Sequence, residues 1–113
     1  MSTVSRTTTD RRRGARRIPR VGVRVECLKG STGLGHNLAE GLIDLSATGV
    51  RLKVRAPLDP GQEVELSLQG QAYSGPIKRF ASVVSCREAP GGGWEAGVSF
   101  RTHLSYAELG SLT

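Results

Sequence analysis

Short segments in which apolar and polar residues alternate make up most of this chain. Three clear cases are residues 21–28, 50–55 and 63–68, where every second position is apolar. A period of two is the side-chain period of a β-strand with one buried face. Turn-forming Gly, Pro and Ser separate the segments, and no helix-period segment lies among them. The pattern therefore predicts an all-β fold with antiparallel strands.

The alternation and the turns together define six predicted strands. These are residues 21–28, 38–45, 50–55, 63–68, 77–87 and 94–100. Residues 77–87 are the least regular, so we expect that strand to bend. A chain of 113 residues is one domain with a small core. Six such strands form an antiparallel barrel or a sandwich. We predict the six-stranded antiparallel β-barrel because closing the sheet leaves no exposed edge.

The C-terminal residues carry the signals of a short helix. Ser105 and Glu108 have the spacing of a capping box, and Leu104 and Leu109 stand at hydrophobic-staple positions. The spacing predicts a helix that begins at Ser105 and runs for one or two turns before the chain ends. A helix this short persists only when it docks on the sheet.

The positive charge of the chain is concentrated at its N-terminus. The net charge is +6, and residues 1–20 hold seven arginines and only one acid, Asp10. Residues 1–15 are polar and lack periodicity, so we expect a flexible arginine-rich arm, followed by a barrel domain over residues 16–113. A basic arm on a neutral body indicates an anionic partner that meets the arm.

Several classes of site and location find no support in the sequence. Cys27 and Cys86 are 59 residues apart without a C-x-x-C pattern, so we expect two reduced thiols, no metal site and no cofactor. His36 and His103 form no catalytic arrangement with them, so we do not expect an enzyme. No apolar run approaches a membrane span or a signal peptide. We expect a cytoplasmic protein.

A polar corner and an arginine pair form the candidate site. Asp44, Ser46 and Gly49 lie between two predicted strands, where a hairpin turn alone accounts for all three residue types. Upstream, Pro19 disfavours a helix, so Arg16 and Arg20 fall on one side of an extended segment. We expect the two arginines and the carboxylate to hold a phosphate-bearing base.

In this order, these residues resemble a known family. Arg16-x-x-x-Arg20, then Asp44-x-Ser46-x-x-Gly49, then Gly97-Val98-Ser99-Phe100 and the helix start at Leu104-Ser105 look like a PilZ domain. The resemblance covers residues 16–109, most of the chain. It implies a six-stranded barrel that binds the bacterial second messenger cyclic di-GMP.

The resemblance gives each candidate residue a role. Arginine pairs bidentately with phosphate or with guanine O6 and N7, which suits Arg16 and Arg20. Asp44 accepts hydrogen bonds from guanine N–H groups, and Ser46 adds a hydroxyl to the base or to the turn. Gly49 allows a close approach of ligand and backbone. Further phosphate contacts or positive field are expected from Arg17, Arg13 and Arg12.

The predicted function is a cyclic di-GMP receptor whose arm folds over the bound nucleotide and signals to a protein effector. One alternative is a PilZ-like adaptor that binds no nucleotide and works through protein contacts. A basic-arm module for nucleic acid is a second alternative, but the neutral body and few aromatic residues disfavour it.

Overall fold

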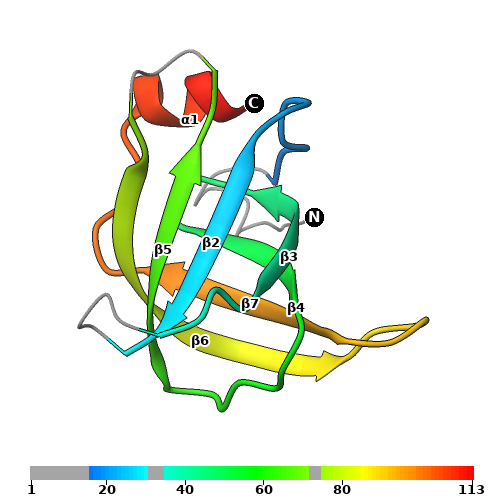
Figure 1. Cartoon of the computed structure of the whole chain (residues 1–113). Helices are drawn as coiled ribbons and strands as arrows, with labels where there is room; N and C mark the ends of the chain where they lie inside the picture. Colours follow the sequence, from blue (N-terminus) through cyan, green and yellow to red (C-terminus); the bar gives the residue numbers. More distant parts are fainter. Residues whose placement is uncertain (1–15, 31–34, 72–74) are drawn as a thin grey trace, which may run out of the picture.

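The computed structural model describes residues 16–30, 35–71 and 75–113. These residues form six strands in one antiparallel sheet and one α-helix (Figure 1). The elements are β2 (Arg24–Lys29), β3 (Ala39–Leu45), β4 (Gly49–Val54), β5 (Glu63–Gln69), β6 (Ile77–Glu88), β7 (Trp94–Phe100) and α1 (Tyr106–Leu112). The sheet has the order β2-β5-β6-β7-β4-β3 and curls into a nearly closed barrel. The predicted six-stranded barrel with a short C-terminal helix is confirmed, and the predicted arm, residues 1–15, lies outside the described residues.

The barrel seam lies between β2 and β3, the two ends of the strand order. At one end of the seam the side chain of Asn37 joins the two strands. Its Oδ1 accepts hydrogen bonds from the backbone N–H groups of Cys27 and Ala39, both at 2.9 Å. Leu38 N–H also donates to the carbonyl of Cys27. These contacts hold β2 and β3 together although no regular ladder of backbone hydrogen bonds joins them.

Alternating apolar side chains fill the barrel, as the period of two predicts. The fully buried large side chains are Leu45, Leu52, Leu66, Leu68, Leu112, Val50, Val54, Val64 and Cys27. Each fully buried aliphatic side chain contributes about 1.5–3 kcal/mol to folding relative to an exposed one. Because the inner positions of every strand go to the core, the outer positions are free to form a site.

The first strand begins later than its sequence pattern predicts. The alternation starts at Val21, but β2 begins at Arg24, and the Val21 side chain is 93% exposed. The predicted start of this strand at residue 21 was therefore wrong. Gly22 has a φ of 90°, and Val23 N–H bonds back to the carbonyl of Arg20, so a turn interrupts the extended backbone here.

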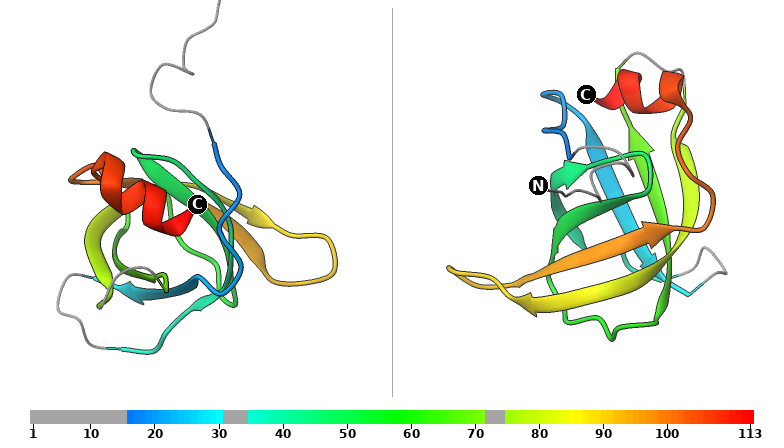
Figure 2. Two further views of the ribbon diagram at one scale, coloured as in Figure 1. Left: turned by 90° about the horizontal axis from the view of Figure 1, so that it is seen from above. Right: turned by 180° about the vertical axis from the view of Figure 1, so that it is seen from behind.

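Strand β6 bends where its pattern is irregular, as predicted. Its pairing with β7 shifts between Val83 and Ser85, which is a β-bulge. The bulge leaves Val84 on the outer surface with 63% of its area exposed. Beyond the bulge the β6–β7 hairpin extends away from the barrel (Figure 2).

Helix α1 covers one end of the barrel (Figure 1). Its N-terminus has the predicted capping box, in which Glu108 N–H donates to Ser105 Oγ and Ser105 N–H donates to Glu108 Oε1. Leu109 and Leu112 are buried against the core. The hydrogen bond from Ser105, together with the guanidinium of Arg79, holds the pKa of Glu108 below its usual range.

Candidate functional site

The corner between β3 and β4 is a compact turn held by its own polar groups. Ser46 N–H donates to the carbonyl of Gly49 at 2.9 Å, and Thr48 N–H donates to Ser46 Oγ at 3.2 Å. Ser46 is buried. Its hydroxyl therefore builds the turn, which agrees with the turn role its sequence position indicates.

Gly49 is required by packing between two strands. A Cβ atom added to Gly49 would lie 2.2 Å from the carbonyl oxygen of Val98 on β7. No side chain fits at that distance, so the glycine lets β4 and β7 pair closely.

Asp44, at the end of β3, is held between two arginines. Arg16 Nη1 donates to Asp44 Oδ1 at 2.8 Å, and Arg51 Nη2 donates to Asp44 Oδ2 at 2.9 Å. The Asp44 side chain is only 10% exposed, whereas those of Arg16 and Arg51 are 54% and 43% exposed. A largely buried carboxylate is thus balanced by two cations that reach the surface.

The backbone of the N-terminal segment brings Arg16 to this carboxylate. Arg17 and Leu45 exchange two backbone hydrogen bonds, Arg17 N–H to Leu45 O at 2.8 Å and Leu45 N–H to Arg17 O at 3.0 Å. In this antiparallel bridge Arg16 and Asp44 are diagonal neighbours on the same face, so the Arg16 side chain reaches the carboxylate. Two of the predicted site residues, Arg16 and Asp44, are thus in direct contact.

Arg51 is the site residue that the sequence did not single out. In the sequence it is one of three basic residues that alternate with apolar ones over residues 50–55, and nothing distinguishes it from the other two. The hairpin register supplies the missing signal, because pairing Leu45 with Val50 across the corner places Asp44 opposite Arg51. The hydrogen bond and negative charge of Asp44 raise the pKa of Arg51 further above its already high value.

A groove of about 250 Å³ opens beside this ion-pair cluster. It is lined by Arg16, Thr48, Gly49, Arg51, Val84, Ser85, Gly97, Val98 and Ser99. Small side chains line the sheet surface here, since the register sets Gly49 opposite Ser99 and Arg51 opposite Gly97. A groove with small residues on its floor and arginines at its border suits a negatively charged ligand with planar bases.

Arg20 does not share the contacts of Arg16. Its backbone N–H donates to the carbonyl of Leu112 at 2.7 Å, and its Nη2 lies 3.4 Å from the carbonyl of Gly110. Both acceptors belong to the C-terminal end of α1, where a positive charge is favoured. The predicted convergence of the two arginines on one ligand therefore requires the Arg20 side chain to change partners. Arg12 and Arg13 lie outside the described residues.

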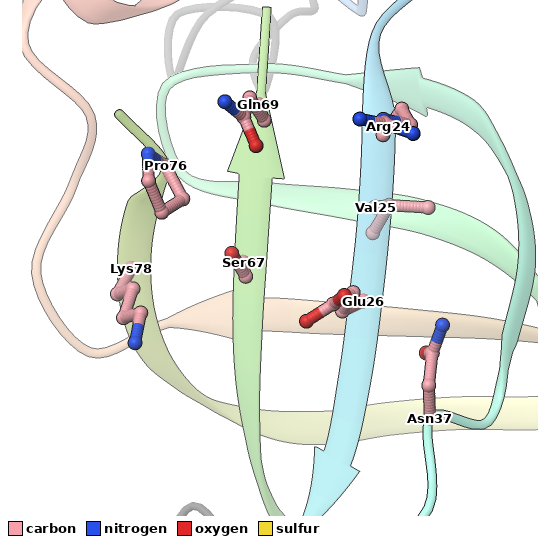
Figure 3. Close-up of a pocket in the computed structure, with 8 residues that line it drawn as sticks. All are labelled: Arg24, Val25, Glu26, Asn37, Ser67, Gln69, Pro76 and Lys78. Carbon is pink, nitrogen blue, oxygen red and sulfur yellow. The ribbon is translucent and has the colours of Figure 1, made fainter. Parts of the chain in front are cut away.

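A larger hollow lies on another part of the barrel surface, over β2, β5 and β6 (Figure 3). It measures about 500 Å³ and is lined by Arg24, Val25, Glu26, Asn37, Ser67, Gln69, Pro76 and Lys78. Its side chains carry both signs of charge and include none of the predicted site residues. The smaller groove is the better candidate because a buried carboxylate and two arginines meet there.

The residues that the structure describes give no indication of a metal site, a membrane-spanning helix or a disulfide. Among them, no cluster of three His, Cys, Asp or Glu side chains is placed to hold a metal ion. The one described helix is too short and too polar to cross a membrane. Cys27 and Cys86 are both free, and burial raises the pKa of the Cys27 thiol to about 11.

Comparison with known proteins identifies the family. A search of the curated proteins finds no match to this chain. The family model for the PilZ domain matches residues 10–112, which include both arginines of the pair, the corner at residues 44–49 and helix α1. The barrel and the matched sequence agree, and the chain belongs to the PilZ domain family.

Proposed function

We propose that this protein is a receptor that binds cyclic di-GMP in the groove beside Asp44 and passes the signal to a protein effector. PilZ domains are in general a family of cyclic di-GMP receptors, a non-catalytic class. The observation that carries the proposal for this chain is the Arg16–Asp44–Arg51 cluster at the edge of a groove floored by small residues.

The groups at the groove match the chemistry of the ligand. Cyclic di-GMP carries two phosphates and two guanines, and a guanidinium pairs bidentately with phosphate oxygens or with guanine O6 and N7. Arg16 is already at the groove and exposed enough to turn toward a ligand. Asp44 offers acceptors to the N–H groups of guanine. Ser46 builds the turn at the corner, and Gly49 lines the groove.

The remaining arginines act from the N-terminal segment. In the proposal, Arg20 leaves the carbonyl of Gly110 and joins Arg16 on the nucleotide. That contact, at 3.4 Å with an exposed side chain, is a weak hydrogen bond that a phosphate readily replaces. Arg17, Arg13 and Arg12 add phosphate contacts or positive field, so that the arm folds over the bound ligand.

Calorimetric titration with cyclic di-GMP tests the proposal. We expect saturable binding by the wild-type protein, none with GTP, and a large loss of affinity for Arg20→Ala. Arg24→Ala is the matched control, because it removes an exposed arginine that lines the other hollow. Absence of heat with cyclic di-GMP, or equal loss in both variants, would contradict the proposal.

Amide hydrogen exchange tests the movement of the arm. We expect residues 10–20 to become protected when cyclic di-GMP is added, because the ligand neutralises and orders the arginines. GTP at the same concentration serves as the control. Equal exchange in these residues with and without cyclic di-GMP would eliminate the clamp, even if calorimetry shows binding.

One structural observation favours a second candidate, an adaptor that binds no nucleotide. Both oxygens of Asp44 already accept hydrogen bonds from arginines, so the site is satisfied without a ligand. In that case the arm and helix α1 would serve protein contacts alone. Calorimetry decides between the candidates, because only the receptor releases or absorbs heat with cyclic di-GMP.

A further inference from the structure

We propose that Arg51 positions Asp44 for a guanine base, holding one carboxylate oxygen while the ligand displaces Arg16 from the other. This inference rests on the proposed function and adds to it a residue that the sequence motifs do not contain. It assigns different tasks to the two arginines that meet at Asp44.

The two arginines differ in how firmly the fold holds them. Arg51 lies within β4, which pairs with β3 on one side and with β7 on the other. Arg16 lies in a segment tied to the barrel beside it by a single bridge, Arg17 with Leu45. A strand paired on both sides cannot move without breaking two ladders, whereas the segment can. Arg51 is therefore the fixed partner of Asp44, and Arg16 is the exchangeable one.

The surroundings of Arg51 indicate a site that the protein alone does not complete. Its Nε is buried and donates to no acceptor among the described residues. Buried unpaired donors are uncommon in native proteins. Its neighbour across the β4–β7 ladder is Gly97, so no side chain covers the guanidinium from that strand. The groove beside the guanidinium is therefore left open for a base that pairs with Asp44.

The hydrogen-bonding capacity of Asp44 allows it to serve Arg51 and a base together. An ionised carboxylate has about four acceptor positions, two on each oxygen. With Arg16 displaced, Oδ1 is free and Oδ2 keeps one position beside its bond to Arg51. The N1–H and 2-amino groups of guanine are adjacent donors that match these two oxygens.

Arg51 also provides the charge that Asp44 needs in the complex. The carboxylate is largely buried, and burying it without a paired cation is strongly unfavourable. Once Arg16 turns to the ligand, Arg51 is the cation that remains in contact with Asp44. Without Arg51, the release of Arg16 becomes costly and binding of guanine weakens.

The test compares cyclic di-GMP with cyclic di-IMP, its analogue in which hypoxanthine lacks the 2-amino group. The ratio of the two affinities reports the pairing of Asp44 with guanine. For Arg51→Ala we expect a loss of about tenfold in affinity for cyclic di-GMP. The preference over cyclic di-IMP should shrink toward one, and Arg51→Lys should restore part of both quantities.

Lys53→Ala is the matched control, because Lys53 is the next outward-facing cation on β4 and does not line the groove. It should keep the wild-type affinity and preference. In the free Arg51→Ala protein Asp44 still has Arg16, so we expect the fold to persist, and thermal unfolding verifies this. Adding Arg51→Ala to Asp44→Ala should cost no further affinity, since Arg51 acts through Asp44.

Each outcome decides the inference. Unchanged binding by Arg51→Ala, or equal losses for both ligands without rescue by lysine, would overturn it while leaving the receptor function intact. Failure of the wild-type protein to bind either nucleotide would overturn the receptor function and this inference with it. The inference is supported if Arg51→Ala reduces the preference for cyclic di-GMP over cyclic di-IMP, Arg51→Lys restores part of it, and Lys53→Ala leaves it unchanged.

Discussion

At the scale of single residues, the corner at Asp44 serves the fold and the proposed site together. Ser46 and Gly49 have roles in packing that explain their presence without a ligand. Asp44 is different, because the fold must balance its buried charge with two arginines. A neutral residue at this position would avoid that cost. Of these three residues, Asp44 therefore carries the strongest argument for a binding function.

Gly49→Ala tests the packing role of the corner. The added Cβ would meet the carbonyl oxygen of Val98, a backbone atom that cannot move without disturbing the β4–β7 ladder. We expect the free energy of unfolding to fall by about 2–3 kcal/mol. Urea unfolding monitored by circular dichroism measures it.

Gly41→Ala, on β3, is the control for this substitution. An added Cβ at Gly41 has no atom within 4 Å, so we expect little change or a small gain in stability. If Gly49→Ala were as stable as Gly41→Ala, the close approach of β4 and β7 would not be what requires the glycine.

At the scale of elements, the sequence predicted those strands and helix ends that depend on contacts between residues close in the chain. The alternation of β5 and the capping box of α1 depend on neighbouring residues, and both occur as predicted. The predicted start of the first strand was wrong, because Val21 fits the alternation although it precedes β2. Arg20 bonds to the end of α1, and the backbone turns at Gly22 before the strand begins. A contact between residues so distant in sequence leaves no periodic signal.

The candidate site shows the same division between local and distant contacts. The sequence placed Asp44 and Arg16 in one candidate site, but it did not single out Arg51, because alternation does not reveal what lies across a hairpin. Likewise, the spacing of Arg16 and Arg20 suggested a shared target, whereas Arg20 contacts the end of α1. Pairing across strands and helix docking decide these positions.

The charge of Glu108 predicts how helix α1 responds to pH. Its folded-state pKa is lowered by Ser105 and Arg79, so the folded state favours the ionised form. This contribution is complete above the unfolded pKa of about 4.3 and is lost as the pH falls through the lower folded value. At pH 7 we expect Glu108→Gln to cost about 1 kcal/mol, and the difference from wild type should shrink toward pH 3.

Thermal unfolding of both proteins at several pH values between 7 and 3 measures this difference. Glu65→Gln on β5 is the control, since Glu65 faces outward and forms no ion pair within the described residues. It should track the wild-type protein at every pH. A Glu108→Gln deficit that stays constant down to pH 3 would show that the carboxylate acts without its charge.

At the scale of the whole molecule, the segment that carries the net charge also reaches the candidate site. All of the net charge of +6 belongs to residues 1–20, and the same segment delivers Arg16 to Asp44 and Arg20 to helix α1. The remaining residues are electrically balanced. An anionic ligand at the groove is therefore attracted by one segment, and the same segment touches the helix that covers the barrel end.

This arrangement predicts a specific salt dependence for ligand binding. Of the two roles proposed for Arg12 and Arg13, the field role depends on salt, because the field reaches about 30 Å at 0.01 M salt but about 3 Å at 1 M. For that role we expect that replacing both with Ala weakens binding of cyclic di-GMP several-fold at low salt and hardly at all at high salt. Titrations of the wild-type and doubly substituted proteins at the two salt concentrations measure the effect. Arg24→Ala supplies the control for one lost charge on the barrel body.

The two salt concentrations separate attraction from direct contact. A field effect disappears when salt screens it, whereas a bidentate contact with a phosphate persists because it depends on short hydrogen bonds. An equal loss at low and high salt would mean that Arg12 or Arg13 binds the phosphates directly, and the clamp would then extend beyond Arg16 and Arg20. A loss confined to low salt would limit direct recognition to the segment that begins at Arg16, where the bridge to Leu45 fixes the chain.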